Sequence, residues 1–146
     1  MALASKKQVL VVAAHPDDEV LGCGGTIARH AGSGDQVHVL IVAEGSTSRQ
    51  QKRDRVQVRD ELSALAQAAQ TAGSILGAAG VDLLDLPDNR LDSLDRLDLI
   101  KLIEECVERH QPDCVYVPPA GDVNVDHRRL HEAAVTAGRR PPGRVR

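Results

Sequence analysis

The fold is decided by one stretch of the sequence, VLVVAAHPDDE at residues 9–19. Its first six residues are apolar without interruption, and three of them are β-branched valines. Such a run is typical of a strand that is covered on both faces, as in a parallel sheet. We expect this strand to end at His15 and Pro16, so that the acidic residues stand on the turn directly after it.

Three more apolar segments, residues 37–43, 81–86 and 114–117, are predicted strands. Helical patterns fill residues 26–31, 55–76, 94–109 and 126–138, and polar residues 44–54 are expected to form a mobile loop. Strands alternating with helices predict an α/β fold, a Rossmann-like parallel sheet flanked by helices. Because ligands collect at the carboxyl ends of such strands, the site should follow Ala14, Ala43, Leu86 and Val117.

Length and composition limit the classes of protein to consider. We expect one domain over residues 1–138 of the 146, followed by a basic, Pro-rich tail at 139–146 that lies outside the fold. A net charge of −3, with Tyr116 the only aromatic residue, argues against a nucleic-acid partner. No apolar run reaches the roughly 18 residues of a membrane span. Three cysteines at unpaired spacings favour a reducing compartment, so a cytoplasmic location is expected, and a homo-oligomer is left open.

The polar turn after the first strand has the chemistry of a metal site. His15 and Asp18, three residues apart, offer an imidazole nitrogen and a carboxylate oxygen, which suit zinc or a similar divalent ion. Asp17 between them could act as a general base on water held by that ion. The density of acidic groups at this strand end favours a bound cation.

A third ligand must come from another segment. His127 follows the fourth predicted strand by a short loop and should lie on the same rim of the sheet. Two histidines and one aspartate leave a coordination position open, as catalytic zinc sites do. Asp126 beside it fits either of two roles, a hydrogen bond to a ligand histidine or the N-cap of the last helix.

These motifs together resemble a known family. His15-Pro16-Asp17-Asp18-Glu19, Gly24-Gly25 and residues 121–127 are similar to the LmbE-like (PIG-L) family of zinc-dependent N-acetylglucosamine deacetylases. The resemblance covers about residues 8–138. It implies a Rossmann-like fold, one Zn²⁺ or other divalent ion on His15, Asp18 and His127, and Asp17 as general base. The implied reaction is hydrolysis of the N-acyl group of a small amino-sugar substrate.

The resemblance also takes in two polar segments, residues 44–49 and 86–90. Arg49, Asp88, Asn89 and Arg90 on these predicted rim loops are candidates for contacts with sugar hydroxyls, or else solvated loop residues. Many family members carry a histidine where this chain has Asn124, which can donate a hydrogen bond but cannot be a cation.

Two alternative functions are considered. Family members are usually longer, so a truncated, catalytically impaired metal-binding remnant is the first. A nucleotide-binding domain is the second, but Gly22, Gly24 and Gly25 lack the full G-x-G-x-x-G pattern, and we expect them to allow close packing of a helix on a strand. The remaining histidines are expected to be structural, solvated or, for His131, at the surface.

Overall fold

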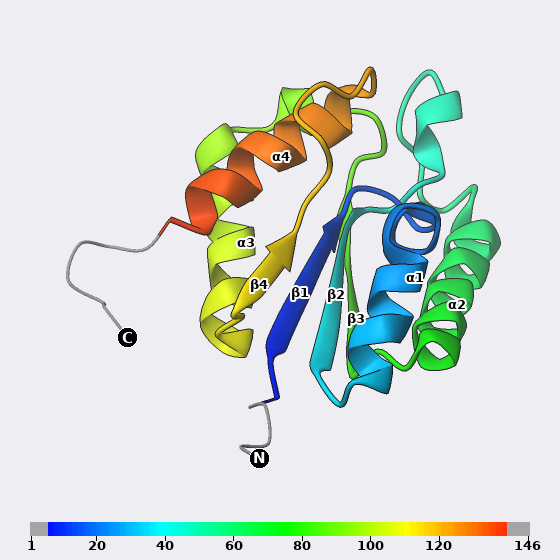
Figure 1. The fold of residues 1–146 in the computed structure, drawn as a ribbon. Helices are drawn as coiled ribbons and strands as arrows, with labels where there is room; N and C mark the ends of the chain where they lie inside the picture. The colour runs from blue at the N-terminus through cyan, green and yellow to red at the C-terminus, as the bar shows by residue number, and fades with distance from the viewer. Residues whose placement is uncertain (1–5, 140–146) are drawn as a thin grey trace, which may run out of the picture.

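The computed structural model describes residues 6–139, which form a parallel sheet between two layers of helices (Figure 1). The strands are β1 (Gln8–Ala13), β2 (Gln36–Ala43), β3 (Gly80–Leu86) and β4 (Cys114–Tyr116). The helices are α1 (Asp18–Gly32), α2 (Arg59–Leu76), α3 (Arg96–His110) and α4 (Val125–Ala137), with 3-10 turns η1 (Thr47–Arg49) and η2 (Leu91–Ser93). The predicted α/β class, with a parallel sheet flanked by helices, is confirmed.

The order of the strands places the site. The sheet has the order β3-β2-β1-β4, and Val9 of β1 pairs with Val37 of β2 on one side and with Cys114 of β4 on the other. The chain therefore moves outward from β1 to β3 and then crosses back to the opposite side of β1. Such a reversal opens a crevice between the carboxyl ends of the two strands on either side of it. Here those strands are β1 and β4.

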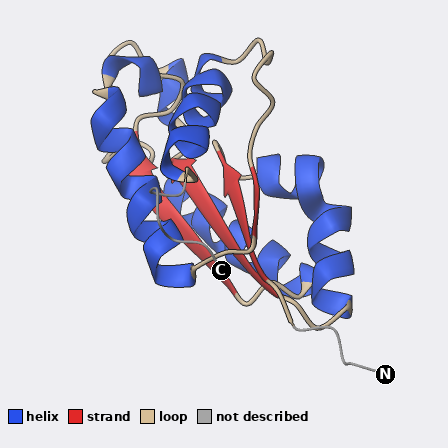
Figure 2. Ribbon diagram, turned by 60° about the vertical axis from the view of Figure 1, so that its left-hand side comes forward, coloured by secondary structure: helices blue, strands red, loops and turns tan. Residues whose placement is uncertain are grey.

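Helices lie on both faces of the sheet (Figure 2), and alternate residues of the central strand belong to different core clusters. Val9, Val11 and Ala13 belong to the core cluster that includes Ile27 of α1 and Ala69 of α2. Their neighbours Leu10, Val12 and Ala14 belong to the cluster formed with α3 and α4. Burial on both faces explains why β1 is apolar without interruption, and it makes this strand the rigid base of the turn that follows it.

The first helix differs from the prediction. It begins at Asp18 instead of residue 26, so Gly22, Gly24 and Gly25 lie inside it. A Cβ at Gly22 or Gly25 would meet no atom within 4 Å, and one at Gly24 would meet Val20 and Leu76, which lie in helices, at ordinary contact distances. The expectation that these glycines allow close packing on a strand is therefore wrong. The helix starts early because Asp18 and Glu19 place carboxylates in its first turn, where the helix dipole favours them.

The other boundaries lie close to those predicted, except that α2 begins at Arg59 instead of residue 55. Gly77 ends α2 in the left-handed conformation at φ 80°, as its place after the apolar stripe predicts. Among the described residues, no helix is both long and apolar enough to cross a membrane. Of the predicted tail, residues 140–146 lie outside the described part of the chain.

Candidate metal centre

The three predicted ligands meet at the crevice between β1 and β4. His15 follows β1, Asp18 opens α1, and His127 lies in the first turn of α4. Asp18 Oδ2 is 3.3 Å from His15 Nδ1 and 3.0 Å from His127 Nε2, and the two ring centroids are 5.4 Å apart. One ligand atom from each residue lies within 4.8 Å of the other two. The fold thus brings together side chains from opposite ends of the sequence, and both imidazole rings share the Asp18 carboxylate.

A second acidic group faces the other nitrogen of His15. The Nε2 atom of His15 lies 2.9 Å from Asp126 Oδ2 and 3.3 Å from Asp88 Oδ1. His15, Asp88 and Asp126 are thus a second set of side chains that could hold a cation. Asp126 is fully buried, and its two oxygens accept the backbone N–H groups of Asn89 at 2.7 Å and Leu91 at 2.9 Å. Because Asp126 already has these donors, it fits the role of orienting His15, which leaves Nδ1 facing the rim.

The second histidine is held in the same way. His127 Nδ1 lies 2.9 Å from Asp122 Oδ2, while its Nε2 faces Asp18. Each imidazole therefore has a carboxylate on the nitrogen that points away from Asp18, the arrangement that fixes the tautomer of metal-binding histidines. Asp122 is not among the site residues predicted from the sequence. Its signals there are a carboxylate five positions before a candidate ligand and a place within the motif at residues 121–127.

The charged groups of the site shift one another's pKa. Burial alone would lower the pKa of His15, but its contacts with Asp126 and Asp18 raise that pKa to about 10. Burial would raise the pKa of Asp18, yet the hydrogen bonds from His15 hold it below its usual value. In the metal-free protein His15 is therefore protonated at neutral pH. A cation that binds here must displace that proton, since only neutral imidazole is a ligand.

Asp17 stands on a strained turn beside these groups. Its φ of 127° lies in a region that non-glycine residues rarely adopt, and its backbone N–H donates to Glu19 Oε2 at 3.0 Å. Asp17 is the N-cap residue of α1, but its side chain makes no capping hydrogen bond. Burial and the neighbouring charge of Asp18 raise its pKa, against the opposing effect of the two histidines. Its exposed carboxyl group is thus placed beside the centre and left out of the helix cap.

Asn124 is the N-cap of α4. Its side-chain oxygen accepts the backbone N–H groups of Asp126 at 2.8 Å and His127 at 3.4 Å. Its Nδ2 donates to Asn89 Oδ1 at 2.9 Å. Asp126 does not cap the helix, so that alternative for Asp126 is wrong. One of the two N–H groups of the Asn124 amide is therefore used by Asn89.

The other predicted rim residues differ in how deeply they are buried. Asp88 is buried, and its Oδ2 accepts the backbone N–H of Ser48 at 3.2 Å. Arg90 donates to the carbonyl of Gln50 at 2.9 Å, while Arg49 and Asn89 are exposed. The structure therefore brings Asp88 to His15, and the exposed Asn89 is hydrogen-bonded to Asp88 and Asn124, whereas Arg49 lies at the surface of the rim.

The segment expected to be mobile is anchored at both ends. Glu44 is buried and accepts the backbone N–H groups of Ser46 at 2.9 Å and Thr47 at 3.1 Å, together with the Thr47 hydroxyl. Arg53 donates to Glu44 Oε1 at 3.2 Å and to the Asp85 carbonyl at 2.9 Å. The hydrogen bonds of Glu44 were not predicted from the sequence.

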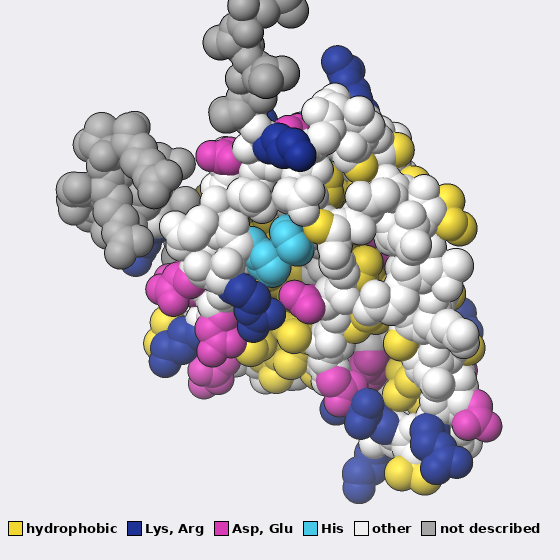
Figure 3. Space-filling model, turned by 90° about the horizontal axis from the view of Figure 1, so that it is seen from below, with side chains coloured by type: hydrophobic (Ala, Val, Ile, Leu, Met, Phe, Trp, Pro, Cys, Tyr) yellow, Lys and Arg dark blue, Asp and Glu magenta, His cyan; other side chains and the backbone are white. Residues whose placement is uncertain are grey.

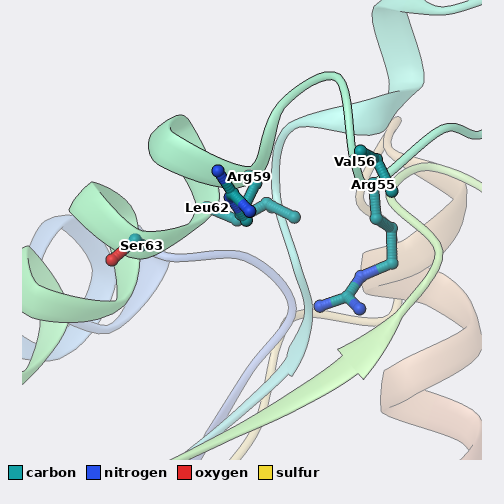
Figure 4. Close-up of a pocket in the computed structure, with 5 residues that line it drawn as sticks. All are labelled: Arg55, Val56, Arg59, Leu62 and Ser63. Atoms are coloured by element: carbon teal, nitrogen blue, oxygen red, sulfur yellow. The ribbon is translucent and has the colours of Figure 1, made fainter.

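A hollow of about 350 Å³ lies at the start of α2 (Figure 4). It is lined by Arg55, Val56, Arg59, Leu62 and Ser63. None of the predicted site residues lines it, so it is separate from the metal centre.

The remaining histidines have partners of their own. His131, predicted to lie at the surface, is half-buried, and its Nδ1–H donates to the carbonyl of Pro118 at 2.7 Å. His30 lies 2.7 Å from Asp35 and 3.1 Å from the Tyr116 hydroxyl, in agreement with a structural role.

The fold and the site together define an α/β protein with a candidate metal centre at the switch point of its sheet. A family model, PIG-L, described as GlcNAc-PI de-N-acetylase, matches residues 10–138. The chain belongs to this family, which confirms the resemblance drawn from its motifs.

Individual relatives match over shorter stretches. A 1D-myo-inositol 2-acetamido-2-deoxy-alpha-D-glucopyranoside deacetylase of Rhodococcus opacus is 56% identical over 41 residues, which are 28% of this chain and 14% of the relative. The corresponding enzyme of Actinosynnema mirum is 51% identical over 45 residues, 31% of this chain and 16% of the relative.

Solved structures match most of the chain. The 4-carboxy-2-hydroxymuconate hydratase GalB of Pseudomonas putida has a TM-score of 0.73 at 30% identity, over 90% of this chain and 55% of that protein. The N,N'-diacetylchitobiose deacetylase of Pyrococcus horikoshii has a TM-score of 0.74 at 24% identity, over 90% of this chain and 49% of that protein. The latter likeness shows the fold alone. The chain thus spans about half the length of these solved proteins.

Proposed function

We propose that this protein hydrolyses the N-acyl amide of an N-acetylglucosamine-type amino sugar, using a divalent cation, preferably Zn²⁺, bound by His15, Asp18 and His127. The observation that carries the proposal is the convergence of these three side chains, with a carboxylate behind each imidazole. Membership of the PIG-L family and the names of the deacetylase relatives support the class of substrate.

The side chains present fit a zinc-class ion. Two imidazole nitrogens and one carboxylate oxygen are a common catalytic zinc set, which leaves a coordination position open. The contacts of His15 and His127 with Asp126 and Asp122 orient the rings for this purpose. The same donor set accepts other divalent ions, so the preference for zinc is part of the proposal.

The protein's own residues supply the proton transfers. When bound, the cation would supply Lewis acidity, which activates water and polarises the amide carbonyl. Asp17 takes the proton of the attacking water, for which its raised pKa and exposed position suit it. The same carboxyl group then gives that proton to the nitrogen as the C–N bond breaks. The products are a free amine and a carboxylate such as acetate.

The proposal is tested by measuring ion content and amine release on the same preparations. Purified protein should hold close to one zinc-class ion at this centre and release amine from N-acetylglucosaminides. His15→Ala, Asp18→Ala and His127→Ala should each hold one ion fewer than the unaltered protein and lose the activity. Full occupancy in all three variants would overturn the ligand assignment, and ion binding without amine release from any substrate would favour an impaired remnant.

A second candidate function is the hydration of an unsaturated acid. It is favoured by the 30% identity with the hydratase GalB over 90% of this chain. Both reactions need an activated water, so the metal centre alone does not separate them. The choice of substrate separates the two reactions. Loss of ultraviolet absorbance with 4-carboxy-2-hydroxymuconate, without amine release from amino sugars, would favour hydration.

A cytoplasmic location and self-association stay predictions.

A further inference from the structure

A second group of metal-ligating side chains lies at the opposite end of the sheet. Asp82 stands near the start of β3, while Cys106 and His110 are one turn apart near the end of α3. One ligand atom from each lies within 4.8 Å of the other two. The group shares no residue with the centre at the carboxyl ends of the strands.

The alternation of the strands explains how these residues meet. Leu84 and Leu86 pack with the cluster on the α3 side of the sheet, so Asp82, two residues before Leu84, faces the same side. His38 has the same relation to Leu40 in β2. Figure 3, which views the molecule from the amino ends of the strands, shows histidine side chains together at the surface, flanked by acidic and basic groups.

One buried atom in this group lacks a partner. His110 Nε2 has no hydrogen bond among residues 6–139, and Asp82 Oδ2, at 3.8 Å, is too distant for one. The His110 ring is stacked on that of His38, with centroids 3.8 Å apart and an angle of 26° between the planes. The stack holds the ring in place. A buried nitrogen without a partner is unfavourable, and a bound ion would satisfy it.

We propose that Asp82, Cys106 and His110 form a second cation site, which takes a thiophilic divalent ion of the zinc class. Sulfur, nitrogen and oxygen ligands from these residue types are all usual for zinc, at bond lengths of about 2.0 to 2.3 Å. Donors on one ion then lie roughly 3.5 Å apart. His110 Nε2 and Asp82 Oδ2, at 3.8 Å, already approach that separation, and all three ligand atoms lie within 4.8 Å of one another. Water fills the remaining position.

Binding changes the protonation of the thiol and the contacts of Asp82. Burial, with the nearby charge of Asp82, raises the pKa of Cys106 to about 11, so the free side chain is a thiol. An S–metal bond replaces the S–H bond, and the proton passes to solvent. Arg109 lies 3.4 Å from Asp82 Oδ2 and is mostly exposed, so it can move away. The ion would tie the end of α3 to β3.

Co²⁺ tests the proposal, because a thiolate bound to Co²⁺ gives a near-ultraviolet charge-transfer band. The proposed catalytic centre has no sulfur ligand, so this band reports the second site alone. The full chain titrated with Co²⁺ should develop the band. Cys106→Ala and His110→Asn should each lose it, with circular dichroism to confirm that they fold. The matched control, Cys23→Ala with Cys114→Ala, should keep it.

The outcomes separate this site from the proposed function. If the proposed catalytic function is wrong, the protein will release no amine from amino sugars, but the Co²⁺ charge-transfer band will still appear. An absent band in the unaltered protein, or a band that survives in both Cys106→Ala and His110→Asn, would overturn the second site. Loss of the band in the Cys23 and Cys114 control would assign the thiolate to another cysteine and overturn it as well.

Discussion

Asp126 Oδ2 lies 2.9 Å from His15 Nε2, although the two residues are 111 positions apart in the chain. The same carboxylate accepts the backbone N–H groups of Asn89 and Leu91. One buried side chain therefore joins the turn after β1, the loop after β3 and the first turn of α4. The position of the His15 ring depends on this junction.

Asp126→Asn should weaken cation binding at the centre by roughly 10- to 100-fold, the usual effect of losing such a partner. Both oxygens of Asp126 accept hydrogen bonds, so an amide nitrogen in either place would face a donor. Competition with a chromophoric chelator measures the affinity. Asp60→Asn, at a fully exposed side chain, is the matched control. Equal affinity in Asp126→Asn and the control would show that the carboxylate does not orient His15.

Asp17→Asn should keep the cation and lose turnover by roughly 10²- to 10⁴-fold, the usual contribution of a general base. The amide cannot take a proton, whereas the three proposed ligands are unchanged. Amine release and ion content, measured on one preparation, check both halves of this expectation. Normal turnover in this variant would remove Asp17 from the mechanism.

The meeting of the three candidate ligands can be anticipated from the sequence where one strand end determines a position. His15 and Asp18 follow a strand whose six apolar residues admit little other interpretation, and His127 follows another strand on the same rim. The start of α1 was missed because three glycines weaken a helical pattern, while packing of Ile27 against the sheet stabilises it.

The partners of these residues were harder to predict. The contact of Asp122 with His127 depends on the path of the turn before α4. Cys106 and His110 meet Asp82 only because the end of α3 lies near the start of β3, and a full loop and most of a helix separate Asp82 from Cys106 in the chain. Spacing in the sequence carries no signal for contacts that arise from the packing of one element on another.

Acid should weaken the protein through Glu44. Burial would raise the pKa of Glu44, but hydrogen bonds from Thr47 and Ser46 and the contact with Arg53 lower it below its ordinary 4.5. The folded state thus binds this proton less tightly than the unfolded state. Its contribution to stability is present above the unfolded pKa and is lost as the pH falls through the lower, folded pKa.

Glu44→Gln removes this contribution. Urea unfolding should show the variant less stable than the original protein at neutral pH, and the difference should shrink as the pH falls below about 4. Glu105→Gln, at an exposed position of α3, is the control and should show no such trend. A difference that stays constant with pH would contradict the role of the Glu44 charge.

The core should be sensitive to loss of a single aliphatic side chain. Ile103 of α3 is fully buried in the cluster that includes Leu10 and Leu130. Ile103→Ala should lower the free energy of unfolding by about 2 to 5 kcal/mol, because a cavity remains. Leu97→Ala, at a residue 59% exposed on the same helix, should change it by about 0.5 kcal/mol or less. Equal effects in urea unfolding would contradict the packing described.

Gly45→Ala should disturb both stability and the metal centre. Gly45 has φ 80°, and a Cβ there would lie 2.7 Å from Cδ of Pro16, within the turn that carries His15 and Asp18. The left-handed conformation costs a non-glycine residue about 1 to 2 kcal/mol. The proline ring is rigid, so it can relieve the clash only by moving that turn. Cation affinity should therefore fall together with the midpoint of urea unfolding.

Gly121→Ala is the matched control, since a Cβ at Gly121 meets no atom within 4 Å. It lies on the loop before α4, near Asp122, so it tests whether any added methyl group beside the centre has the same effect. Cation affinity that falls in Gly45→Ala and stays unchanged in Gly121→Ala would show that contact with Pro16 positions the ligands. Unchanged affinity in Gly45→Ala would mean that the turn after β1 is held by β1 and α1 alone.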